Sequence, residues 1–185
     1  MGLEPVVYRN FISEAERLEL LDHSNSIPLR INSRYKPDDT THITNQSAPY
    51  GTRTSAKLDG TIYSTPLIGV LFDRIVSTLQ LRNPVIDPMI GQIVSVIKPG
   101  GLIHLHRDQY IQPEFKHKHN LRFNIMVERG SDNSYNPIIE NKGYIVNRCD
   151  AWCFSATKYL HRTLTISGPE NRVVYQFGFA VNIGE

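Results

Sequence analysis

Residues 99–108 of the chain read PGGLIHLHRD, and the end of this stretch carries three potential metal ligands at alternate positions. His104, His106 and Asp108 stand at every second position, so on a β-strand all three would point to one face of a sheet. A histidine and a carboxylate two residues apart can bind one metal ion, but two ligands do not complete its coordination shell. At least one more ligand must come from another part of the chain.

The composition is that of an ordinary globular protein. The 185 residues suffice for one domain, and 40% of them are hydrophobic. A net charge of +2 gives no support for a nucleic-acid partner or an anionic membrane. The two cysteines, Cys149 and Cys153, are too few for a disulfide framework, and neither a signal peptide nor a membrane-spanning apolar run is evident. We therefore expect a cytoplasmic protein, of an oligomeric state that the composition does not indicate.

Two helices are predicted in the first half of the chain, Ser13 to about His23 and Thr65 to about Leu81. Ser13 is a suitable N-cap, and the proline after Thr65 fits the first helical position. The region 32–64 is rich in turn-forming residues and predicts only one or two short strands, near Arg53 to Lys57 and Thr61 to Tyr63. A long irregular region of this kind is either plain surface or a lid over a binding site.

The rest of the chain has the β-branched and alternating pattern of short strands separated by turns. The predicted strands are Val6 to Phe11, Ile90 to Ile97, Leu102 to His106, Leu121 to Val127, Gly143 to Asn147, Ala151 to Ser155, Thr163 to Ile166 and Val173 to Val181. This spacing favours a mainly β fold, a double-sheet jelly roll with two N-terminal helices packed on one sheet. We expect a single domain over residues 1–185, with a helical and loop-rich part over 1–88 and the jelly-roll core over 89–182.

His161 is the candidate third ligand, because it immediately precedes a predicted strand and lies 55 residues after His106. Arg172 follows eleven residues later, at the start of the last long strand. Two histidines and one carboxylate leave about three octahedral positions open, which suits iron(II) with a chelating cosubstrate and dioxygen. If the chelator is a 2-oxo acid, an arginine is the best group to hold its far carboxylate.

The set His106-Arg107-Asp108, His161 and Arg172 resembles the pattern of the iron(II)- and 2-oxoglutarate-dependent oxygenases. The lead-in Pro99 to Ile103 is similar to the turn before the ligand strand of that family. The stretch from Gly143 through Trp152-Cys153-Phe154 to His161 resembles the aspartyl/asparaginyl β-hydroxylase-like branch. A prolyl-hydroxylase-like branch is the other candidate.

The resemblance covers about residues 90 to 181 and implies a double-stranded β-helix of the cupin-like type. It implies that His106, Asp108 and His161 bind iron(II) and form the catalytic centre, and that Arg172 binds 2-oxoglutarate. The activity implied is hydroxylation of an amino-acid side chain, free or in a peptide or protein. Dioxygen is consumed and 2-oxoglutarate is decarboxylated to succinate.

The sequence departs from the family pattern at two positions. Many members carry Ser or Thr two residues after the arginine, where this chain has Val174. The β-hydroxylase-like branch carries Arg-x-His on the strand where this chain has Arg122-Phe123-Asn124. We interpret Asn124 as a possible donor to the metal-side carboxylate of 2-oxoglutarate.

Several roles stay open at this point. His104 shares a strand face with His106 and is either a ligand or a lining residue of the substrate pocket. Arg122 points either to solvent or into the pocket, and Trp152 is either core or a substrate platform. Residues 117–119, His-Lys-His, are a solvated basic loop or a contact for an acidic substrate. Two other functions remain as alternatives: a cupin-like binding module without turnover, and an oxygenase that acts on a nucleobase.

Overall fold

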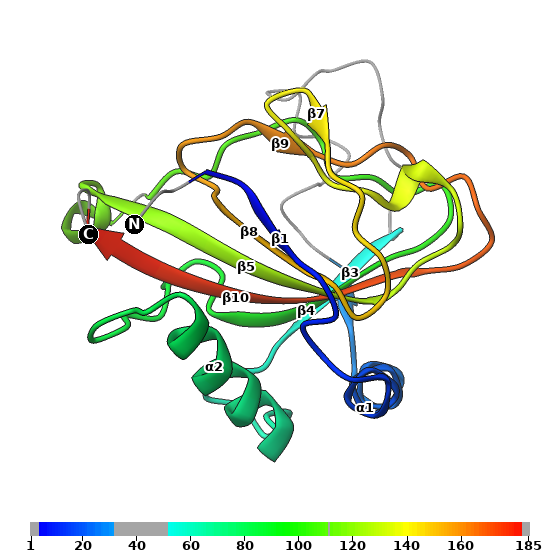
Figure 1. Ribbon diagram of the computed structural model, residues 1–185, viewed down its shortest axis with the longest axis horizontal. Coiled ribbons are helices and arrows are strands. Elements are labelled where there is room, and N and C mark those ends of the chain that lie inside the picture. The colour runs from blue at the N-terminus through cyan, green and yellow to red at the C-terminus, as the bar shows by residue number, and fades with distance from the viewer. Residues whose placement is uncertain (1–3, 32–51, 111, 183–185) are drawn as a thin grey trace.

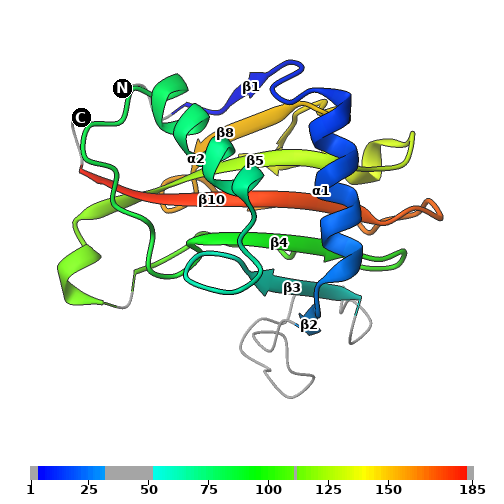
Figure 2. The same cartoon turned by 90° about the horizontal axis from the view of Figure 1, so that it is seen from below.

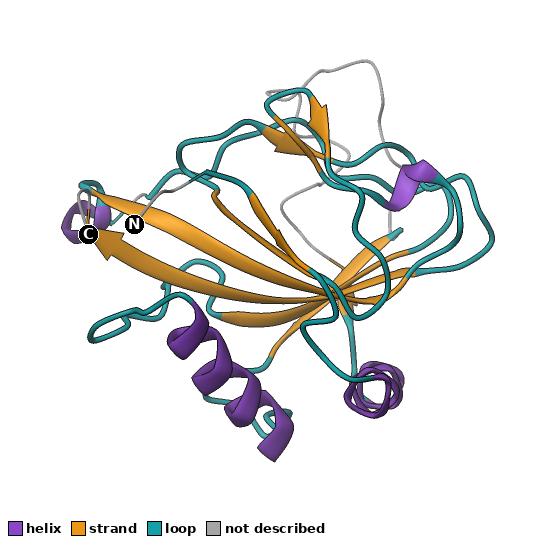
Figure 3. Cartoon of the chain, viewed as in Figure 1, coloured by secondary structure: helices purple, strands orange, loops and turns teal. Residues whose placement is uncertain are grey.

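A computed structural model describes residues 4–31, 52–110 and 112–182 of the chain. Two antiparallel sheets lie one above the other, and two helices cover the outer face of the larger sheet (Figure 1). The secondary structure is mainly strand, as Figure 3 shows. The predicted architecture, a mainly β fold with two helices on one sheet, is confirmed.

The larger sheet has seven strands in the order β1-β8-β5-β10-β4-β3-β2, and all neighbours are antiparallel. In that order the strands are Val6–Tyr8, Ala151–Ser155, Lys118–Glu128, Arg172–Asn182, Gln92–Ile97, Arg53–Lys57 and Arg30–Ile31. The smaller sheet has the order β7-β6-β9, formed by Lys142–Gly143, Ile138–Ile139 and His161–Arg162. The first three strands of the chain thus extend both edges of the larger sheet.

The helix α1, Glu14–Ser26, begins at a capping box. The backbone N–H of Glu16 donates to the Ser13 hydroxyl, and the Glu16 carboxylate accepts from the Ser13 backbone N–H at 2.8 Å. The helix α2, Pro66–Thr78, has proline in its first turn as the sequence predicts, and it ends three residues before the predicted Leu81. Both helices cross the larger sheet (Figure 2), and Arg74 of α2 joins them through an ion pair with Glu16 at 2.6 Å. In the described residues, two short 3-10 helices, Pro113–Phe115 and Asn133–Tyr135, lie in the connections.

Alternation along the long strands separates the two faces of the larger sheet. Phe123, Ile125 and Val127 of β5 point toward the helices and belong to the main hydrophobic core. Arg122, Asn124 and Met126, which alternate with them, are also buried and belong to the opposite face, toward the smaller sheet. A polar set of side chains is therefore enclosed between the two sheets.

Four of the predicted elements differ from the structure. The segments Leu102 to His106 and Thr163 to Ile166 are not regular strands, although single backbone hydrogen bonds join them, as between Thr163 N and Ile103 O at 3.1 Å. Residues 61–63 form a turn, because the Thr61 hydroxyl and backbone close it by hydrogen bonds to Leu58 O. The strand predicted over Gly143 to Asn147 is limited to β7. The region 32–51 of the proposed lid lies outside the described residues.

Within the described residues, no helix is both long enough and apolar enough to cross a membrane. Cys149 and Cys153 are free thiols. Cys153 is part of the core under the helices, and burial raises the pKa of its thiol, so it remains protonated.

Candidate metal centre

The side chains of His106, Asp108 and His161 converge between the two sheets. Their potential ligand atoms all lie within 4.8 Å of one another. The backbone brings them together, because His106 and His161 face each other in a β-bridge with hydrogen bonds of 3.1 and 2.9 Å. Asp108 is tied to the same region by its backbone N–H, which donates to Ala156 O at 2.9 Å. The third ligand proposed from sequence thus lies directly beside the first two.

Both histidine rings are oriented by backbone carbonyl groups. His106 Nδ1 donates to His104 O at 2.7 Å, and His161 Nδ1 donates to Tyr159 O at 3.1 Å. This fixes the tautomer that leaves each Nε2 with a lone pair. His161 Nε2 is buried and has no hydrogen-bond partner among the described residues. A buried nitrogen that is kept as an acceptor and left unbonded is what a metal ligand requires.

The electrostatics keep both rings neutral at pH 7. Burial, followed by the charges of His106 and Arg122, lowers the pKa of His161 to about 3. Burial is also the main cause that lowers the pKa of His106. Neutral imidazoles can coordinate a metal ion without first losing a proton.

The two oxygens of Asp108 have different neighbours. Oδ1 lies 3.6 Å from His106 Nε2, on the side where the three potential ligands meet. Oδ2 accepts a hydrogen bond from Arg122 Nη2, in an ion pair between two buried side chains. One oxygen is thus held by Arg122 while the other faces the histidines, an arrangement that fits monodentate binding of a metal ion.

Arg172 is the largest fully buried side chain of the described part of the chain. Its Nε donates to Tyr135 O at 2.8 Å, and its guanidinium lies 5.4 Å from the centre of the Trp152 ring. Its Nη1 is buried and has no hydrogen-bond partner in the described part of the chain. Burial, with smaller effects from the charges of Arg53 and Arg129, lowers the pKa of Arg172 to about 9, so it stays a cation at pH 7. A buried cation with an unbonded N–H is suited to a carboxylate ligand.

A narrow pocket of about 30 Å³ connects Arg172 to the histidines. Its floor is the inner face of the larger sheet, where Asn124 Oδ1 accepts from Gln176 Nε2 at 3.1 Å. Its roof comes from the smaller sheet and its flanking segments. The described lining residues are Arg53, Ile103, His106, Arg122, Asn124, Pro137, Ile139, Trp152, Phe154, His161, Arg162, Thr163, Arg172 and Gln176. No aspartate or glutamate is among them.

The structure sorts the residues whose roles the sequence left open. Arg122 points inward and pairs with Asp108. Trp152 lines the pocket and also packs in the smaller core between the sheets, together with Val174. His104 is half-buried and supplies its carbonyl to His106, but it is not one of the described lining residues.

Sequence reasoning missed Arg53, Arg162 and Gln176 as lining residues. Gln176 could have been found, because it is a polar residue at an alternate position of a strand that is otherwise apolar. Arg53 could not, because its place depends on strand register. Arg53 of β3 and Arg172 of β10 both pair with Ile97 of β4, which lies between them. The three side chains therefore point to the same face of the larger sheet.

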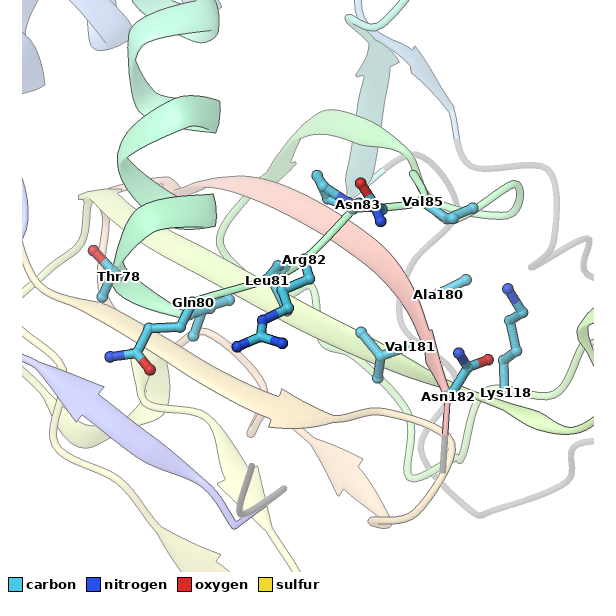
Figure 4. Close-up of a pocket in the computed structure, with 12 residues that line it drawn as sticks. Thr78, Gln80, Leu81, Arg82, Asn83, Val85, Lys118, Ala180, Val181 and Asn182 are labelled. Atoms are coloured by element: carbon cyan, nitrogen blue, oxygen red, sulfur yellow. The ribbon is translucent and has the colours of Figure 1, made fainter. Parts of the chain in front are cut away.

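A second cavity, of about 700 Å³, lies elsewhere (Figure 4). It is lined by Thr78, the last residue of α2, by residues 79–85 after it, and by Lys118 and the last residues of β10. Because Arg172 begins β10 and Asn182 ends it, roughly 30 Å of extended strand separates this cavity from Arg172. Its lining contains none of the residues that converge between the sheets.

No family model and no curated protein matches the sequence. HygX from Streptomyces hygroscopicus, solved with nickel, 2-oxoglutarate and hygromycin B bound, matches the structure with a TM-score of 0.70. The match covers 96% of this chain and 82% of that chain at 7% sequence identity.

Two further solved structures have the same arrangement. A prolyl hydroxylase from Trichoplax adhaerens, in complex with a peptide fragment of the hypoxia-inducible factor oxygen degradation domain, matches with a TM-score of 0.66 at 13% identity, over 97% of this chain and 84% of that one. An oxidoreductase of the 2OG-Fe(II) oxygenase family from Burkholderia pseudomallei matches with a TM-score of 0.61 at 10% identity, over 95% and 84%.

The fold is that of the iron(II)- and 2-oxoglutarate-dependent oxygenases. The jelly roll predicted from the strand pattern, with its double-stranded β-helix, is thereby confirmed. At these identities the likeness concerns the fold, and the chemistry depends on the side chains of this chain.

Proposed function

We propose that the protein is an iron(II)- and 2-oxoglutarate-dependent dioxygenase, formed by one catalytic domain over residues 1–185. The observation that carries the proposal is the pairing of two unbonded buried nitrogens in one pocket. His161 Nε2 belongs to a group of three potential metal ligands, and Arg172 Nη1 belongs to a buried cation. The first is suited to the metal and the second to the far carboxylate of 2-oxoglutarate.

Each side chain has a defined task in this reaction. His106 Nε2, Asp108 Oδ1 and His161 Nε2 are the proposed ligands, and Arg172 anchors the cosubstrate. Asn124 Nδ2 donates to Arg122 O and Trp152 O at 3.4 Å, and we propose that it exchanges one of these long bonds for the metal-side carboxylate of 2-oxoglutarate. Iron(II), when bound with 2-oxoglutarate and dioxygen, supplies the oxidation of an unactivated carbon coupled to decarboxylation to succinate. Trp152, Phe154 and Ile139 give the pocket apolar walls that exclude water.

The substrate that we propose is an amino-acid side chain, either free or in a peptide or protein. The support is the fold, which is shared with a prolyl hydroxylase that was solved with a peptide fragment. The nickel and 2-oxoglutarate bound to HygX support the same cofactor set, with nickel in place of iron.

Anaerobic titration with iron(II) and 2-oxoglutarate tests the proposal. The chelate should give a weak visible charge-transfer band, and succinate should form when air is admitted. Neither should occur in Asp108→Ala or His161→Ala. A cupin-like binding module without turnover would bind a ligand but give no succinate, and that result would refute the proposed function.

A further inference from the structure

Arg162 lines the pocket without a hydrogen bond or ion pair to any described residue, and the proposed cofactors do not use it. It follows His161 in β9, is half-buried, and lines the same pocket. Its Nε is fully buried, and its guanidinium makes no hydrogen bond or ion pair with any described residue. By contrast, Arg122 is paired with Asp108, and Arg172 donates to Tyr135 O.

An unpaired guanidinium that is partly removed from water is unfavourable. A buried donor left unbonded costs about 1–3 kcal/mol, and more when it is charged. Such a group persists where a ligand completes it, which is the same reasoning that applies to Arg172 and His161. Arg162 therefore indicates a missing anion on its side of the pocket.

The sum of charges in a site that holds iron(II) and 2-oxoglutarate also indicates a missing anion. The two charges of iron(II) would offset the two of 2-oxoglutarate, and Asp108 already offsets Arg122. Arg162 would then retain its charge beside Arg172, in a lining that contains no described aspartate or glutamate.

Arg53 adds to this positive field. Its charge lowers the pKa of both His106 and Arg172, so it lies close to the metal centre and to the cosubstrate end of the pocket. Because Arg53 and Arg172 both pair with Ile97 of β4, Arg53 shares the inner face of the sheet with Arg172.

We propose that the substrate carries an anionic group, a carboxylate or a phosphate, and that Arg162 binds it, with Arg53 contributing positive potential. This inference rests on the proposed function, because it places the substrate beside the metal ligands. A guanidinium donates two parallel hydrogen bonds to either anion and would fix the orientation of the substrate over the open coordination positions.

The test uses matched peptides and the protein loaded anaerobically with manganese(II) and 2-oxoglutarate. Blocked peptides that contain Asp, Glu or phosphoserine are compared by calorimetry with their Asn, Gln or Ser counterparts and with a Lys peptide. We expect at least one anionic member to bind ten or more times more tightly than its neutral counterpart. Comparison of the Asp and Glu arms with the phosphoserine arm distinguishes a carboxylate from a phosphate.

Variants assign the effect to Arg162. Arg162→Gln should remove the anionic preference, while Arg162→Lys should retain most of it and shows that the charge, not the fold, is responsible. Arg82→Gln, at an exposed arginine that lines the other cavity and not this pocket, is the matched control and should keep the full preference.

Three results would overturn the inference: binding by no anionic peptide, equal or tighter binding by neutral or Lys peptides, or an anionic preference that survives Arg162→Gln. Binding of manganese(II) and 2-oxoglutarate is measured first, in the absence of peptide. Absence of this binding would refute the proposed function. Failure of the proposed function is therefore distinguishable from failure of the anion inference alone.

Discussion

Phe123 and Asn124 are neighbours in β5, yet they belong to opposite faces of the larger sheet. Phe123 is fully buried on the helix side, where its ring lies 4.8 Å from that of Phe11 and 5.3 Å from that of Tyr8. Asn124 is equally buried on the other side, where it accepts a hydrogen bond from Gln176. Burial alone therefore does not distinguish the residues that stabilise this fold from those that line its pocket.

The two faces differ in how completely their polar atoms are satisfied. On the helix side the side chains are nearly all apolar and pack against α1 and α2. Between the sheets, buried nitrogens of Arg122, His161, Arg162 and Arg172 have no partner among the described residues. We interpret the first face as the source of stability and the second as a binding site whose ligands complete it.

The largest effect should follow from removing a metal ligand. His161→Ala should lower succinate formation at least about a thousandfold, which corresponds to about 4 kcal/mol. Far-ultraviolet circular dichroism should be unchanged, because the helix-side core is intact. Leu164→Ala, at an exposed position of the same segment, is the control and should retain activity. Succinate release by His161→Ala at the wild-type rate would contradict the ligand assignment.

Substitution of Phe123 should lower stability and spare the chemistry. Phe123→Ala should lower the free energy of unfolding by about 3–5 kcal/mol, because it leaves a cavity in the main core. Folded enzyme should keep its 2-oxoglutarate requirement. Denaturant titration and steady-state kinetics together check this, with Asn124→Ala as the counterpart on the other face. A tenfold change in the 2-oxoglutarate KM of Phe123→Ala would break the division between the faces.

Arg172 should affect the cosubstrate and spare the metal. Loss of one charge-assisted contact is worth about 1.5–3 kcal/mol, so Arg172→Gln should raise the 2-oxoglutarate KM by about 10–100-fold. Metal binding, measured by calorimetry, should change little. Equal weakening of metal and 2-oxoglutarate binding would instead indicate that Arg172 acts through the fold.

The smallest effect is on the pH dependence of stability, through Glu16 of α1. The hydrogen bond from Arg74, with further help from Ser13, holds the pKa of Glu16 at about 2, below its usual 4.5. Because the unfolded state binds the proton more tightly, Glu16 contributes stability above pH 4.5, and this is lost as the pH falls toward 2. We expect about 1 kcal/mol, reduced by solvent screening.

Denaturation of wild type and Glu16→Gln between pH 6 and pH 2 measures this contribution. The variant should be less stable at pH 6 and should show a shallower decline. Glu19→Gln, on the exposed side of the same helix, is the control and should follow wild type. Turnover at pH 7 should be the same in all three proteins.

Much of the fold was predictable, because local signals agree with the final structure. β3 and β8 have the predicted bounds, and the predicted β4, β5 and β10 differ at their ends by only a few residues. Alternation along β5 also left two candidate faces, and the apolar one does pack against the helices. The strand predicted over 102–106 was wrong. Ile103 N donates to the Thr163 hydroxyl at 2.8 Å and not to a backbone carbonyl, which interrupts a regular ladder of backbone hydrogen bonds.

The candidate site was only partly predictable. Spacing along the chain identified the set that the structure brings together, since His-x-Asp and the later histidine and arginine have a recognisable order. The contact between Arg122 and Asp108, and the place of Arg53 beside Arg172, depend on register across several strands. No local pattern encodes register between strands that are far apart in sequence.

The β-bridge between His106 and His161 has a consequence for the durability of the protein. A metal ion bound by both rings would cross-link two points that are 55 residues apart in the chain. By the chain-entropy relation used for disulfides, closing a loop of this length restricts the unfolded state by about 4 kcal/mol. The ion would then act as a reversible staple, and a cell that is short of iron would hold a protein that is both inactive and more easily unfolded.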